Sequence, residues 1–135
     1  MDELDVTASL RLRTSEGNHE EAIRSFPQSR IDAEWRKGQE HRLGRRHEDS
    51  GANVFLAEGH DFSSVFERSL SVIRLKPEVF RRLRELRVEL ELDIGVFSAE
   101  GPEVSFGVSA DDMGLLAASG IRLRVSMYLS DDTNP

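Results

Sequence analysis

The stretch from Arg87 to Ser109, RVELELDIGVFSAEGPEVSFGVS, constrains the fold more than any other part of the chain. Its first half alternates between apolar residues and acids or glycine: Val88, Glu89, Leu90, Glu91, Leu92, Asp93, Ile94, Gly95 and Val96. Alternation with a period of two puts the apolar set on one face of a β-strand and the acids on the other. A turn over 98–103 and a second alternating run, Val104, Phe106 and Val108, predict a β-hairpin with one face on a core and one in water.

The rest of the chain supplies further strands and several helices. Alternation predicts strands over 6–13 and 121–129 and shorter ones at 31–35 and 54–57. Helical spacing predicts a short helix over 18–26, two helices or one kinked at Pro77 within 62–86, and a small helix between Ser109 and Gly120. Asn18, Asp61 and Ser109 are the candidate caps of these helices. We therefore predict a single α+β domain over 1–130, with a mostly antiparallel or mixed sheet and helices packed on one face, and a frayed tail over 131–135.

The polar faces of the long strands predict which strands are neighbours. One strand presents three acids in a row, whereas the first and last strands present arginines: Glu89, Glu91 and Asp93 against Arg11, Arg13, Arg122 and Arg124. Carboxylates side by side repel one another, whereas each pair of opposite charges across two strands stabilises the sheet by roughly 0.2–1 kcal/mol. We expect the first or the last strand to lie beside the acidic one.

Composition excludes several classes of protein. The 135 residues include no cysteine, which rules out disulfides and thiolate metal sites and fits a reducing compartment. The N-terminus, MDELDVTASL, is acidic where a signal peptide is basic, and no apolar run approaches the ~20 residues that span a bilayer. We expect a cytoplasmic protein with no membrane association. The net charge of −7 argues against a nucleic-acid partner and leaves a basic protein partner open.

No motif predicts catalysis. The chain has no glycine-rich phosphate loop, no G-x-S-x-G element and no histidine pair of the H-E-x-x-H type. His41 and His47 lie near Glu48 and Asp49, but surface histidines in a loop explain them more simply than a divalent metal site does. Acids on an open sheet face are ordinary solvated groups. We predict no catalytic residue, no metal and no cofactor, and no feature of the sequence supports an enzymatic function.

The candidate binding residues lie in the only basic region, from Arg30 to His47. They are Trp35, Arg36, Lys37, Arg42, Arg45 and Arg46. Basic residues around an aromatic ring can bind single-stranded nucleic acid, but Asp32, Glu34 and Glu40 are interleaved here. A ligand-binding or partner-binding loop and a plain solvated connection both remain open, and in the plainer interpretation Trp35 is a core residue.

Several segments together resemble a known family. They are ASLRLRT, EWRKGQE at 34–40, VFLAEG, SLSVIRLKPEVFRRLREL and MGLLAASGIRLRVSMYL. Over nearly the whole chain this resembles the bacterial domain-of-unknown-function family numbered 4279, with Arg36-Lys37-Gly38 and the C-terminal strand ending at Tyr128 the most telling pieces. The resemblance implies a small bacterial cytoplasmic α+β protein. It does not point to any particular activity, because the family is uncharacterised.

These observations predict a non-enzymatic module that binds another protein. Its sharpest version is an immunity-type protein that neutralises a basic toxin, by analogy with other small acidic bacterial proteins. The alternative is a small-ligand sensor or enzyme with its site around Trp35 to Arg46. A third interpretation is a structural subunit that forms homodimers through a sheet edge. The sequence does not predict the oligomeric state.

Overall fold

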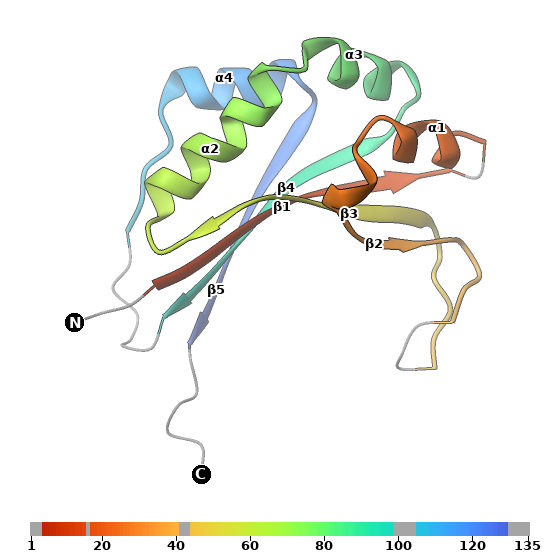
Figure 1. Cartoon of the computed structure of the whole chain (residues 1–135), viewed down its shortest axis with the longest axis horizontal. Helices are drawn as coiled ribbons and strands as arrows, with labels where there is room; N and C mark the ends of the chain where they lie inside the picture. The colour runs from red at the N-terminus through yellow and green to blue at the C-terminus, as the bar shows by residue number, and fades with distance from the viewer. Residues whose placement is uncertain (1–3, 16, 41–43, 99–104, 130–135) are drawn as a thin grey trace.

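The computed structural model describes residues 4–15, 17–40, 44–98 and 105–129. It contains one mixed sheet of five strands with four α-helices on one side of it (Figure 1). The predicted α+β architecture with helices on one face is therefore confirmed. The tail predicted at 131–135 lies outside the described residues.

The strands are β1 (Leu4–Thr14), β2 (Ile31–Trp35), β3 (Ser50–Gly59), β4 (Glu89–Ser98) and β5 (Ile121–Leu129). The helices are α1 (His19–Arg24), α2 (Phe62–Arg74), α3 (Pro77–Glu85) and α4 (Ala110–Ala118), with a 3-10 turn at Gln28–Arg30. The order across the sheet is β2-β3-β1-β4-β5. All neighbouring strands are antiparallel except β4 and β5, which are parallel.

The core lies between the helices and one face of the sheet. Alternate residues of β1 and β4, among them Leu10 and Leu92, are fully buried on that face. Helix α2 packs across β3 and β1 and inserts Leu70 and Ile73 into the same cluster. Burial of one strand face and one helical stripe is what the period-two and helical spacings predict.

The predicted strand neighbours are confirmed on both sides of the acidic strand. β4 pairs with β1, which places Arg13 opposite Glu89, and with β5, which places Arg122 opposite Glu91. The Arg13 and Glu89 side chains lie 3.4 Å apart and those of Arg122 and Glu91 3.6 Å apart. Unlike charges therefore flank β4 on both sides.

The predicted hairpin is wrong. The neighbours of β4 are β1 and β5, and residues 105–109 form no strand. Phe106 instead stacks on Phe62 of α2 with ring centroids 4.0 Å apart, and Val108 packs against the core. A parallel neighbour requires a crossover connection, so the chain leaves β4, passes the helix layer through α4 and returns as β5. Val104 and the predicted turn at 99–103 lie outside the described residues.

The predicted caps at Asp61 and Ser109 are confirmed, and the one at Asn18 is wrong. The Asp61 side chain accepts a hydrogen bond from the Ser64 amide at 2.9 Å and caps α2, and Ser109 caps α4 through the Asp112 amide at 3.1 Å. Pro77 occupies the first turn of α3, so the segment 62–86 is two helices. Asn18 precedes α1 but does not cap it, because its side chain bonds the Ser15 amide and the Leu86 carbonyl instead.

Helix α3 ends in a Schellman motif that carries arginine at the left-handed position. Arg87 has φ = 59°, and the Val88 amide donates to the Leu83 carbonyl at 3.0 Å. A residue with a Cβ pays roughly 1–2 kcal/mol in this conformation, whereas glycine does not. We expect Arg87→Gly to raise the free energy of unfolding by about 1 kcal/mol in a urea titration.

A matched control stands at the end of α4, where Gly120 has φ = 69°. Gly120→Ala should lower the free energy of unfolding by about 1 kcal/mol, because it introduces the strain that Arg87→Gly removes. A lower stability of the Arg87→Gly variant would show that the arginine side chain supports the turn.

Candidate functional site

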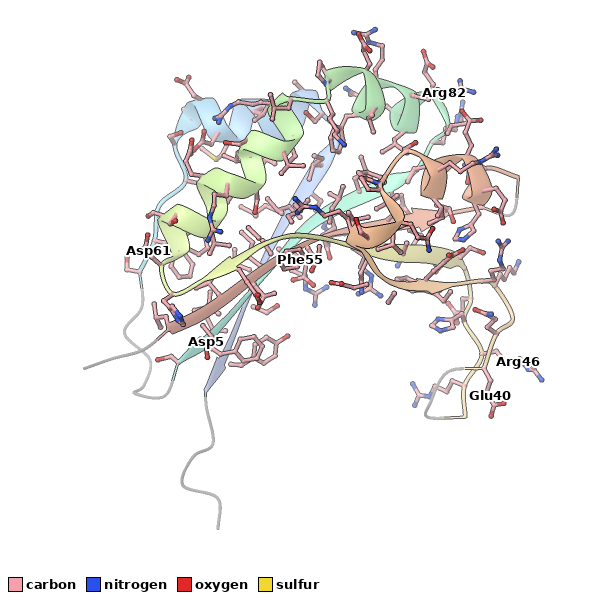
Figure 2. The ribbon with its side chains drawn as sticks, viewed as in Figure 1. Asp5, Glu40, Arg46, Phe55, Asp61 and Arg82 are labelled. Carbon is pink, nitrogen blue, oxygen red and sulfur yellow. The ribbon has the colours of Figure 1, made fainter. Side chains whose placement is uncertain are left out.

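The candidate site is the face of the sheet that the helices leave uncovered, called here the open face. Its side chains come from alternate positions of the strands: Arg11 and Arg13 of β1, Trp35 of β2, Asn53 and Phe55 of β3, Glu91 and Asp93 of β4, and Arg122 and Arg124 of β5. Figure 2 shows Phe55 below the β3 ribbon, on the side away from the helices. An α+β sheet with one bare face offers such a surface to a partner.

Trp35 lies on the open face, and its glycine strand partner lets the indole lie against the backbone. Trp35 at the end of β2 pairs with Gly51 of β3, and a Cβ on Gly51 would lie 2.5 Å from Cζ2 of the indole. The indole therefore rests directly on the β3 backbone. His47 stacks on it with ring centroids 5.6 Å apart, and the Arg11 guanidinium lies 5.4 Å from its centroid. Trp35 is half-buried on the open face, and its interpretation as a core residue is wrong.

Two shallow hollows adjoin on this face. The tryptophan hollow, of about 390 Å³, is lined by Arg11, Ala33, Glu34, Trp35, Glu40, His47 and Asn53. The arginine hollow, of about 540 Å³, is lined by Arg11, Arg13, Val88, Glu89, Leu90, Glu91, Gly120, Arg122 and Arg124. Arg11 lines both, so it marks the point where the two hollows meet.

Three of the four arginines in the arginine hollow lie within ion-pair distance of a carboxylate. Arg13 pairs with Asp49 at 3.0 Å as well as with Glu89, while Arg122 and Arg124 share the carboxylate of Glu91. Arg11 differs, because no carboxylate of the described residues lies within ion-pair distance of it. Its guanidinium faces only the Trp35 ring, and it is the arginine of this hollow best placed to take an incoming anion.

The structure disperses the predicted binding residues rather than gathering them. Arg36 pairs with Glu20 and Glu34, which neutralises its charge. Arg46 donates to the Gly38 carbonyl at 2.9 Å, and Figure 2 shows the labelled Glu40 and Arg46 away from the strands of the sheet. Lys37 and Arg45 are exposed, and Arg42 lies outside the described residues. Of the predicted set, Trp35 alone lies against the hollows.

Sequence reasoning missed a buried polar chain next to this site. His19 is fully buried, with Nδ1 2.6 Å from the Thr14 hydroxyl and Nε2 2.8 Å from the Glu34 carboxylate. A hydroxyl, a histidine and a carboxylate in line resemble a catalytic triad. The Thr14 side chain is buried, however, so its hydroxyl meets no substrate, and the chain joins α1 to the ends of β1 and β2. Residues that meet in the fold but belong to separate helices and strands have no fixed spacing in the sequence, so no sequence pattern marks them.

The described residues contain no metal-binding cluster and no membrane-spanning helix. No group of three or more histidine, cysteine or acidic side chains among residues 4–15, 17–40, 44–98 and 105–129 is placed to hold a metal ion. His41, part of the conceivable divalent site, lies outside these ranges. No helix in the part of the chain that the structure describes combines the length and the apolarity needed to cross a bilayer.

Comparison of the chain with protein-family models, with curated proteins and with solved structures finds no match in any of the three. The resemblance to family 4279 stays a prediction, and the function has to be argued from the open face itself.

The contact between Gly51 and Trp35 can be tested directly, because Trp35 is the only tryptophan of the chain. In Gly51→Ala the added methyl collides with the indole and with the Leu12 carbonyl. We expect a loss of about 1–3 kcal/mol in the free energy of unfolding and a red shift of tryptophan emission. Gly17→Ala is the control, since nothing lies within 4 Å of a Cβ there. An unchanged emission spectrum in Gly51→Ala would contradict the placement of Trp35.

The buried chain through His19 predicts a large effect on stability. His19→Ala leaves a cavity and removes the partner of the Thr14 hydroxyl, which should lower the free energy of unfolding by about 2–4 kcal/mol. His60→Ala is the control, because the His60 side chain is 77% exposed, and it should change stability by less than about 0.5 kcal/mol. Equal melting curves for the two variants would rule out a structural role for His19.

Proposed function

We propose that the protein is a non-enzymatic binding module that holds another protein on the open face of its sheet. An acidic segment of that partner docks at Arg11, between the tryptophan hollow and the arginine hollow. The observation that carries the proposal is the guanidinium of Arg11, which lies on the Trp35 ring without a carboxylate partner among the described residues.

The charges around Arg11 support an acidic segment. The arginine hollow is lined by four arginines and two glutamates, which leaves a local excess of positive charge on a chain whose net charge is −7. A carboxylate entering there gains a charge-assisted hydrogen bond from Arg11 without displacing an existing ion pair. Arginine and tryptophan are also the residue types most often found at binding hot spots.

The shape of the site supports a macromolecular partner over a small one. Both hollows are shallow and open to solvent, and they adjoin through Arg11 instead of enclosing a volume. Small ligands bind mostly in enclosed, largely apolar pockets, whereas a protein segment can lie across adjoining depressions and fill both. An immunity-type role fits here as the more specific proposal: a basic toxin suits the net charge of −7, and an acidic segment of that toxin suits Arg11.

A second candidate function is supported by the convergence on Trp35. The indole, the His47 ring and the Arg11 guanidinium lie together in the tryptophan hollow, beside Asn53. An anion of low molecular weight could pair with Arg11 beside the indole. This is the small-ligand alternative, now centred on Arg11 and His47 instead of on the predicted arginines of the loop.

The proposal is tested by affinity capture from the host lysate, followed by titration of the captured protein. Arg11→Glu should weaken that binding at least tenfold, equivalent to ~1.4 kcal/mol, because it opposes the incoming acid. Arg81→Glu is the matched control: Arg81 is an exposed arginine of α3, in the helix layer, and its change should leave the affinity unchanged.

A double variant separates the open face from the loop. Arg36→Glu with Lys37→Glu should bind normally if the open face is the site, and should bind at least tenfold more weakly if the predicted loop residues form it. Normal binding by the Arg11→Glu variant would overturn the proposal. Quenching of Trp35 emission by a small dicarboxylate, lost in Arg11→Glu, would favour the small-ligand candidate.

A further inference from the structure

We propose that two copies of the chain associate through β5, which pairs antiparallel with β5 of the second copy about a two-fold axis at Val125. This inference rests on the edge of the sheet and is independent of the function proposed for the open face. It names the occupant of that edge as a second copy of this chain.

The first observation is the geometry of the edge. β5 is the outermost strand next to β4, and it pairs over nine residues without a register shift. An edge strand exposes a row of backbone N–H and C=O groups, which proteins usually protect with charged side chains, above all lysine, or with proline or a bulge. β5 contains no lysine, proline or bulge, and its two arginines, Arg122 and Arg124, are paired with Glu91 of the neighbouring strand β4. The opposite edge, β2, is five residues long and has a register shift, so it is a poor template for a second strand.

The second observation is the apolar surface at the end of β5. Five large apolar side chains of the described residues are exposed, and three of them lie at this end of the sheet: Phe97, Met127 and Tyr128. Phe97 and Tyr128 lie on the open face and stack with ring centroids 4.7 Å apart, whereas Met127 lies on the helix side of the sheet and is 42% exposed. Helix α4 packs on β5, yet among the β5 side chains that the structure describes, from residue 121 to residue 128, Ile121 alone is buried. A second β5 would cover part of this surface.

Symmetry and charge then select the register. A two-fold axis perpendicular to the sheet makes the strands antiparallel, keeps the helices of both copies on one side and places one residue opposite itself. With Val125, the midpoint of β5, at the axis, all nine residues pair. Arg122 then lies opposite Tyr128 of the second copy and Arg124 opposite Ser126 of the second copy. Moving the axis to Arg124 would place two arginines directly opposite each other, which is destabilising.

The register predicts a disulfide that only one position can form. The chain has no cysteine, so a single introduced cysteine can form a disulfide only with the same cysteine of another copy of the chain. Directly opposed residues of an antiparallel pair have Cα atoms about 4.5–5.5 Å apart, within disulfide range. Val125→Cys should give a covalent dimer under mild oxidation. Leu123→Cys is the control, since the two cysteines would be offset by four residues, or about 13 Å, along the strands.

The strength of association is tested by charge at Ser126. Ser126→Arg places two like-charged pairs across the axis, against Arg124 of each copy, and Ser126→Glu places two unlike pairs there. In sedimentation of the full chain at low salt, we expect the first to raise the dimer dissociation constant about tenfold and the second to lower it. Thr7 supplies the matched control. Thr7 of β1 and Ser126 of β5 are the two strand neighbours of Gly95, but Thr7 lies inside the sheet and Ser126 lies on its edge. Thr7→Arg and Thr7→Glu should leave association unchanged.

Three results would overturn the proposal. The first is a wild-type chain that stays monomeric at millimolar concentration. The second is a cross-link that forms as readily at residue 123 as at residue 125. The third is a dimer dissociation constant that moves in the same direction for Ser126→Arg and Ser126→Glu. The proposal fails as well if Thr7→Arg and Thr7→Glu change that constant as much as the Ser126 variants do, because net charge and not the register would then explain the change. Circular dichroism of each variant establishes whether it is folded. If a Ser126 variant does not fold, the measurements on the wild type and on Val125→Cys still test the proposal.

Discussion

The unlike charges on both sides of β4 are the constraint on which the arrangement of the sheet depends. Glu91 is only 15% exposed and is shared by Arg122 and Arg124 of β5, while Glu89 meets Arg13 of β1. Without arginine-bearing neighbours, three carboxylates in a row would repel one another on a half-buried strand. This pairing fits the order β1-β4-β5 and places the arginines of both flanking strands on one face. The open face and its arginine hollow follow from that order.

One arginine is left over from this pairing, and its position explains the site. Arg11 lies in register with Glu91, but the Glu91 carboxylate is taken by β5. Arg11 turns instead to the indole of Trp35, which reaches it across β3 because Gly51 has no side chain. The tryptophan hollow therefore depends on a charge pairing two strands away and on one glycine. Neither Trp35 nor Arg11 would form a site alone.

The parts of the fold that follow from local rules could be predicted from the sequence. The alternation in β1, β4 and β5 and the caps at Asp61 and Ser109 involve residues close together in the chain, and all are confirmed. The hairpin failed because alternation tells which face of a strand is buried but not which strand lies next to it. Phe106 alternates like a strand residue, yet its partner is Phe62 of α2.

The candidate site was predictable only in part, for the same reason. Trp35 stands out by residue type, and Arg11 was recognised only as one member of a polar stripe. Arg36 looked available because its neutralising partner Glu20 lies on α1, whose position depends on packing. His19 carries no signal in the sequence because Thr14 and Glu34, which satisfy its ring nitrogens, come from the ends of different strands. Whether a charged side chain is paired can be judged only when the positions of all neighbouring helices and strands are known.

The two proposals meet at β5, and this coupling is a consequence of the geometry. Arg122 and Arg124 line the arginine hollow and also stand on the edge strand. In the proposed dimer the two-fold axis is perpendicular to the sheet, so both open faces look the same way and the two arginine hollows flank the axis. A partner with two acidic segments could then occupy both, and the second contact would form at a high effective concentration. By linkage, whatever dimerisation adds to the affinity for such a partner, the partner adds equally to the stability of the dimer. A shared strand is thus sufficient to couple binding on the face to association at the edge, without any change in the fold.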